Sequence, residues 1–147
     1  MDEKVKKFIS AKNWRFVVLQ DQSTAPGGAD AKLYADTLLS LATFYAPRLP
    51  AGPTGGEVLL YSTWGHRDGA RKGREEHKAA YPNFLSMQGK TAAGYVAYKA
   101  ALLAEVPELR VSVVPVGLAY ELVYRLEVAA GRDPRCMPPL LTYADVC

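Results

Sequence analysis

The chain has 147 residues, of which 49% are hydrophobic and 22% charged, and its formal net charge at pH 7 is +3. This length and composition are typical of one globular domain with a buried core, so we expect a single domain over residues 1–147. The small positive excess does not by itself indicate nucleic-acid binding, and the apolar runs are too short to predict a membrane span. Two cysteines, Cys136 and Cys147, are too few for a disulfide framework or a zinc site.

The first half of the chain alternates helical and extended patterns. Apolar residues at helical spacing predict a helix over residues 2–12. Residues 15–20 form a short apolar run rich in β-branched side chains, which is typical of a buried parallel strand. After a turn-rich loop, the spacing predicts a second helix over residues 30–45, which Pro47 would end.

The second half repeats this alternation. A linker rich in Pro and Gly leads to a second strand at residues 58–62. The polar stretch over residues 63–83 is unusually long for a loop in a compact domain, and loops of this length are often functional. The longest helical pattern covers residues 84–105, and a third strand at residues 110–116 precedes a helix over residues 117–130. Three apolar strands that alternate with helices predict an α/β domain with a parallel sheet.

Five short segments of the chain resemble, in the same order, motifs of a family of unknown function within the SGNH (GDSL-like) hydrolases. They are residues 14–23, Tyr61-Ser62-Thr63-Trp64-Gly65, Met87-Gln88 with Gly94-Tyr95, Pro115-Val116-Gly117, and Tyr143-Ala144-Asp145. The resemblance implies a three-layer α/β/α, flavodoxin-like parallel sheet. It also implies hydrolysis of esters, such as acyl groups on carbohydrates, without a metal or a cofactor.

The resemblance suggests roles for particular residues. Asp145 corresponds to the triad acid, which orients a catalytic histidine; its alternative is an ordinary loop carboxylate. Gln22 takes the place of an oxyanion donor, because a side-chain amide can stabilise the developing charge; its alternative is to cap backbone groups. Strand ends are where α/β sheets gather their sites, which favours Gln22 and Trp64. We expect Trp64, His66 beside it, and Gln20 at the end of the first predicted strand to contact substrate.

Two groups of a serine esterase are not identified. The chain contains no Gly-Asp-Ser-Leu-type turn, and the catalytic histidine would follow Cys147. We therefore expect an incomplete hydrolase domain, without the nucleophile strand and the terminal histidine segment, that does not hydrolyse esters alone. Ser23 has no Gly-x-Ser-x-Gly context, so we interpret it as a loop serine and not as a nucleophile served by His66 or His77.

An alternative hypothesis is a non-catalytic module that binds a carbohydrate or an anion through Trp64 and the cation-rich residues 66–78. Acidic residues dilute the charge of this segment, which favours a solvated loop over a nucleic-acid surface. His66 and His77 lack the spacing of a metal motif. The expected ligand is a small-molecule or carbohydrate ester, with no nucleic acid and no membrane.

The strand at residues 16–19 also predicts self-association. In the related family this strand lies beside the nucleophile strand, which we do not find in the sequence. Without that neighbour the strand becomes an exposed edge, and no charge or proline within residues 16–19 discourages pairing with another chain.

Overall fold

The computed structural model describes residues 3–10, 14–52, 55–70 and 75–132. Its elements in chain order are α1 (Glu3–Ser10), β1 (Phe16–Leu19), α2 (Ala31–Ser40), the π-helical turn η1 (Leu41–Tyr45), the 3-10 turn η2 (Ala46–Arg48), β2 (Glu57–Tyr61), α3 (Glu75–Ala80), α4 (Phe84–Glu105), β3 (Arg110–Val114) and α5 (Val116–Ala129). The three predicted strands and the 22-residue helix α4 are confirmed.

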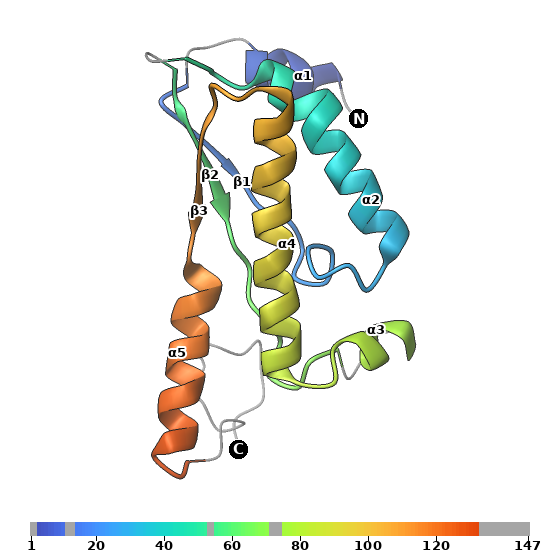
Figure 1. Ribbon diagram of the computed structural model, residues 1–147, viewed down its shortest axis with the longest axis vertical. Coiled ribbons are helices and arrows are strands. Elements are labelled where there is room, and N and C mark those ends of the chain that lie inside the picture. Colours follow the sequence, from blue (N-terminus) through green and yellow to red (C-terminus); the bar gives the residue numbers. More distant parts are fainter. Residues whose placement is uncertain (1–2, 11–13, 53–54, 71–74, 133–147) are drawn as a thin grey trace.

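The strands form one parallel sheet in the order β1-β2-β3 (Figure 1). Phe16 of β1 lies opposite Glu57 of β2, which in turn lies opposite Arg110 of β3. Because all three strands run the same way, their carboxyl ends meet at one edge of the sheet. The predicted α/β class with a parallel sheet is therefore confirmed.

The core lies between one face of this sheet and the helices α2 and α4. Val58 and Leu60 of β2 are 0% and 1% exposed, and they pack in a cluster with side chains of α4 and η1. The buried members are Leu41, Ala46, Leu49, Val58, Leu60, Tyr95, Tyr98, Leu102, Leu109 and Val111. The second half of α4 packs on the sheet through Tyr95, Tyr98 and Leu102. Its first half extends beyond the sheet towards α3 and α5 in Figure 1, where Met87 packs with Ala70 and Tyr81.

The other face of β1 is open. Phe16 and Val18 are 50% and 58% exposed, whereas the alternate residues Val17 and Leu19 pack against the core. Parallel sheets usually carry helices on both faces, so this exposure sets the strand apart from an ordinary interior strand.

Two elements differ from the sequence-based expectation. The predicted helix over residues 30–45 is regular only to Ser40 and continues as the turns η1 and η2, with Pro47 inside the second turn. Helix α3 lies within the stretch expected to be a loop, and its six residues are too few for a clear helical period.

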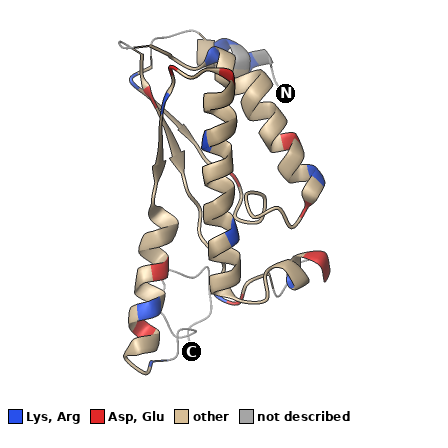
Figure 2. Cartoon of the chain, in the orientation of Figure 1, with Lys and Arg blue, Asp and Glu red and all other residues tan. Residues whose placement is uncertain are grey.

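Charges of both signs are interspersed along the helices in Figure 2. On α5, for example, Arg125 pairs with Glu121 at 2.7 Å, and such exposed pairs stabilise a helix by only about 0.3–0.5 kcal/mol. The fold therefore depends on its apolar core. Among the described residues, no helix is both long enough and apolar enough to cross a membrane.

Candidate functional site

The loop after β1, residues 20–30, is held against α4 at several points. The hydroxyl of Tyr95 accepts a hydrogen bond from the Asp21 N–H at 3.1 Å, and the Thr91 hydroxyl donates to the Ser23 carbonyl at 3.2 Å. A Cβ at Gly94 would lie 1.9 Å from the Pro26 carbonyl oxygen, so only glycine allows this close approach. Helix α4 thus positions the residues that follow the strand.

Tyr81 holds the same loop from a second direction. Its side chain is fully buried, and its hydroxyl donates to the Thr24 carbonyl at 2.9 Å and accepts from the Ala29 N–H at 3.0 Å. Burial raises the pKa of Tyr81 above its ordinary value, so the phenol stays protonated and keeps donating. A Cβ at Gly27 would lie 2.2 Å from this hydroxyl, which explains a glycine at that position.

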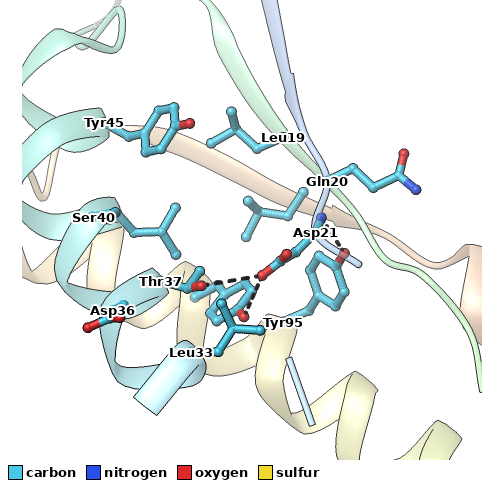
Figure 3. A pocket seen from close by; sticks show the side chains of 12 residues that line it. Leu19, Gln20, Asp21, Leu33, Asp36, Thr37, Ser40, Tyr45 and Tyr95 are labelled. Atoms are coloured by element: carbon cyan, nitrogen blue, oxygen red, sulfur yellow. Dashed lines mark hydrogen bonds between the residues drawn. The ribbon is translucent and has the colours of Figure 1, made fainter. Parts of the chain in front are cut away.

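A cavity of about 320 Å³ opens at the carboxyl end of β1, between the strand, α2 and α4 (Figure 3). Its apolar part consists of leucines, and its polar part of hydroxyl groups and carboxylates. The lining residues are Leu19, Gln20, Asp21, Leu33, Asp36, Thr37, Ser40, Leu41, Tyr45, Leu60, Tyr95 and Tyr98. Ligand pockets of α/β sheets commonly lie at strand ends of this kind.

Asp21 is the polar centre of the pocket. Its Oδ2 accepts hydrogen bonds from the Tyr98 hydroxyl at 3.0 Å and from the Thr37 hydroxyl at 3.5 Å, and its Oδ1 accepts from the Gln22 N–H at 2.7 Å. Burial, and then the neighbouring Asp21 carboxylate, raise the pKa of Tyr98, so this phenol remains a donor. A carboxylate has acceptor sites beyond these three bonds, so a ligand hydroxyl can still donate to it.

Around the end of β2, the polar groups bind one another. The Ser62 hydroxyl donates to the Val114 carbonyl at 2.8 Å and accepts from the Gly117 N–H at 3.3 Å. The buried Gln88 accepts from the Gly65 N–H through Oε1 at 3.0 Å. The Ser62 bonds join the end of β2 to the end of β3 and to the start of α5, and the Gln88 bond joins the loop after β2 to α4.

Thr63 and Tyr95 link the segments that follow β1 and β2. Their hydroxyl groups lie 3.5 Å apart, and the same Tyr95 hydroxyl holds Asp21. The pocket around Asp21 and the polar groups after β2 are therefore parts of one hydrogen-bonded edge.

Trp64 and His66 lie after β2 and are not among the residues that line the pocket. The Trp64 ring stacks on Tyr120 of α5, with centroids 4.2 Å apart and an angle of 5° between the planes. The His66 N–H donates to the Met87 Sδ at 3.2 Å. Partial burial of the imidazole lowers the pKa of His66.

The other predicted residues are placed as follows. Gln20 lines the pocket rim, and Figure 3 shows its amide pointing away from Asp21. Gln22 is exposed, and its backbone bond to Asp21 ties it to the pocket. Asp145 lies outside the described residues, as do both cysteines. His77 lies on α3, and its buried Nε2 has no hydrogen-bond partner within the described part of the chain.

Among the residues that line the pocket only Gln20 was predicted as a site residue, and the hydrogen-bonded group of Asp21, Thr37, Tyr95 and Tyr98 was missed. One signal was available, because a carboxylate directly after a buried strand falls at the carboxyl edge of the sheet. Tyr95 and Tyr98 also have the spacing that places two side chains on one helix face. Neither pattern reveals that their hydroxyl groups meet the loop after β1.

No group of three or more metal-binding side chains occurs among the described residues. Comparisons of the chain with protein-family models, curated proteins and solved structures find no match. The arrangement of the described residues is suited to binding a ligand with hydroxyl groups and a small apolar part.

Proposed function

We propose that this chain is part of an SGNH-type ester hydrolase and binds the substrate at the carboxyl edge of its sheet. The supporting observation is that four of the five segments resembling this family meet there, through bonds that include Gly117 to Ser62, whereas the fifth, residues 143–145, lies outside the described residues. Asp21 is bonded to Tyr95, Tyr95 lies beside Thr63, and Gly65 is bonded to Gln88. Residues far apart in the sequence are thus joined where α/β enzymes place their sites.

The proposal includes the finer features that the resemblance implies. The parent fold is the three-layer, flavodoxin-like sheet, in which Asp145 acts as the triad acid. Gln22 donates its side-chain amide to the oxyanion, and its exposed position beside Asp21 leaves that amide accessible. Trp64 and His66 contact a more distant part of the substrate.

The pocket suggests a carbohydrate ester as the substrate class. Its volume of about 320 Å³ lies at the lower end of the range for ligand sites, which suits one sugar unit or a short acyl chain. The Asp21 carboxylate would accept hydrogen bonds from sugar hydroxyl groups, and the rings of Tyr45 and Tyr95 border the same space. The leucines Leu19 and Leu33 provide apolar contact for the acyl group.

For residues 1–147 by themselves we expect binding without turnover, because they contain no serine in a family-type nucleophile turn. A serine-directed fluorophosphonate probe should therefore label no residue, and acetyl esters should be hydrolysed no faster than in buffer. Stoichiometric labelling of Ser23, or of any other serine, would show that the nucleophile had been misjudged.

A second candidate function is a carbohydrate-binding module. The observation in its favour concerns Asp21, at the centre of the pocket. Its carboxylate accepts hydrogen bonds from two hydroxyl groups and a backbone N–H, and among the described residues no histidine bonds to it as in a catalytic triad. The two functions differ in what they require of the ligand. A hydrolase site gains affinity from the acyl group, whereas a sugar-binding module binds the deacetylated sugar equally well.

Isothermal titration with acetylated xylobiose and with xylobiose separates these outcomes. We expect the acetylated sugar to bind more tightly, and Asp21→Asn to weaken its binding about tenfold through loss of a charged acceptor. Asp68→Asn makes the same chemical change outside the pocket lining and should leave the affinity unchanged. Equal binding of both sugars would favour the module, and no binding of either would contradict both functions.

A further inference from the structure

Strand β1 presents its free backbone groups at the edge of the sheet. The Arg15 carbonyl accepts from the Glu57 N–H at 2.9 Å, so the backbone groups of residues 15, 17 and 19 point towards β2. Those of Phe16, Val18 and Gln20 point the other way. No other strand of the described residues pairs with this side of β1.

The side chains at this edge do not oppose pairing. Phe16 and Val18 are the exposed apolar residues of the open face, at 50% and 58%. Natural edge strands usually carry a lysine, a proline or a bulge that prevents association with other chains. The charges nearest to β1 lie outside the strand, at Arg15 before it and Asp21 after it.

We propose that two copies of this chain associate by antiparallel pairing of β1 about a two-fold axis at Val18. Val18 then lies opposite Val18 of the second copy, and Phe16 lies opposite Gln20 of the second copy. These are the residues whose N–H and C=O groups point outward, so each pair exchanges both of its backbone hydrogen bonds.

Charge complementarity selects this register. With the axis at Val18, Arg15 lies opposite Asp21 of the second copy, in a pair without backbone bonds where side chains approach most closely. Both residues alternate with Phe16 and Val18, so their Cβ atoms point to the face that α4 covers. The Arg15 guanidinium lies 5.6 Å from the centre of the Phe16 ring, and it would turn towards Asp21 of the second copy on pairing. An axis at Val17 would instead place Arg15 opposite Leu19, and parallel pairing would bring the two Arg15 side chains together.

This association does not require the proposed hydrolase or sugar-binding function, although it shares Asp21 with the proposed ligand site. Among the described residues no strand pairs with this side of β1, and we infer that a second copy takes this place. Pairing would also bring Arg15 of the second copy to the rim of the pocket, beside Asp21. The test below uses Val18, which does not line the pocket, so it can fail without affecting the ligand-binding result.

Engineered cysteines test the register directly. In a background of Cys136→Ser and Cys147→Ser, Val18→Cys would place two thiols across the axis, where a Cα separation of about 5.5 Å suits a disulfide. Phe16→Cys is the matched control, because its exposure is similar but its counterpart lies four residues along the strand, about 14 Å away. Mixing Phe16→Cys with Gln20→Cys should restore the cross-link.

The interface is small, so the experiment uses about 0.5 mM protein. At this concentration we expect mild oxidation to convert most Val18→Cys chains to covalent dimer. Phe16→Cys alone should give little. Light scattering of the wild-type chain should show a mass rising towards twice 16.0 kDa with concentration, and Arg15→Gln should weaken this association about fivefold at low salt. A monomer at all concentrations would overturn the proposal, as would cross-linking that is equal at Val18 and Phe16 or stronger at Phe16.

Discussion

The hydroxyl of Tyr98 donates a 3.0 Å hydrogen bond to the Oδ2 of Asp21, and so joins the middle of α4 to the second residue beyond β1. Tyr98 is 2% exposed and belongs to the core that also contains Val58 and Val111 of the neighbouring strands. The position of the pocket carboxylate therefore depends on the same packing that holds the sheet.

Replacing Tyr98 by phenylalanine should lower the free energy of unfolding by about 1–2 kcal/mol, because it removes a hydrogen bond to a charged group without leaving a large cavity. Tyr124→Phe is the control: this ring stacks on Phe84 with centroids 4.6 Å apart, and that contact survives the change. Urea unfolding monitored by circular dichroism measures both variants. Equal stability of the two would show that the Tyr98–Asp21 bond contributes nothing.

The stability should also fall at alkaline pH in a way that depends on Tyr98. Its pKa is raised in the folded state, whereas an unfolded tyrosine ionises near pH 10. The stabilisation is therefore complete below about pH 10 and decreases above it, by up to about 1.4 kcal/mol per pH unit, as the unfolded chain releases a proton that the folded chain retains. Comparing urea unfolding at pH 8 and pH 11 should give a steeper loss for the wild type than for Tyr98→Phe. Parallel losses would contradict the assigned shift.

Two glycines of α4 provide a test of how the loop after β1 is packed. Gly94→Ala should destabilise the protein by more than about 2 kcal/mol, because the new Cβ would lie 1.9 Å from the Pro26 carbonyl oxygen. The Cβ added by Gly89→Ala would meet no neighbouring atom within 4 Å, so this change should be neutral or stabilising by up to about 1 kcal/mol. Thermal unfolding of both variants checks this; a tolerated Gly94→Ala would mean that the loop is not held as described.

The strands and the long helix were predictable because they depend on local patterns. Apolar runs mark β2 and β3, and Asn83 before α4 accepts from the Ser86 N–H at 2.9 Å as an N-cap. The turns after α2 were not predictable, because the apolar spacing continues unchanged through Leu41 and Phe44. The position of β1 at an edge was also predicted, but the apolar pattern did not reveal which of its residues would be exposed.

The pocket could be anticipated only in its location. Gln20, Asp21 and Gln22 lie at the carboxyl edge of the sheet because of the strand order and direction. The turn-rich loop that follows the predicted strand already suggests that the strand ends there. The partners of Asp21 come from α2 and α4, and their contacts depend on how those helices cross the sheet. Periodicity identifies the buried face of a helix but not the atom that each side chain reaches.

The proposed function requires that the pocket around Asp21 binds a carbohydrate ester. This binding can be measured by titrating the ¹⁵N-labelled chain with acetylated xylobiose and following the backbone amide signals. We expect the largest shifts at Asp21, Gln22 and Thr37, and we expect Asp21→Asn to reduce them. Shifts confined to Trp64 and His66, or no shifts at all, would contradict it.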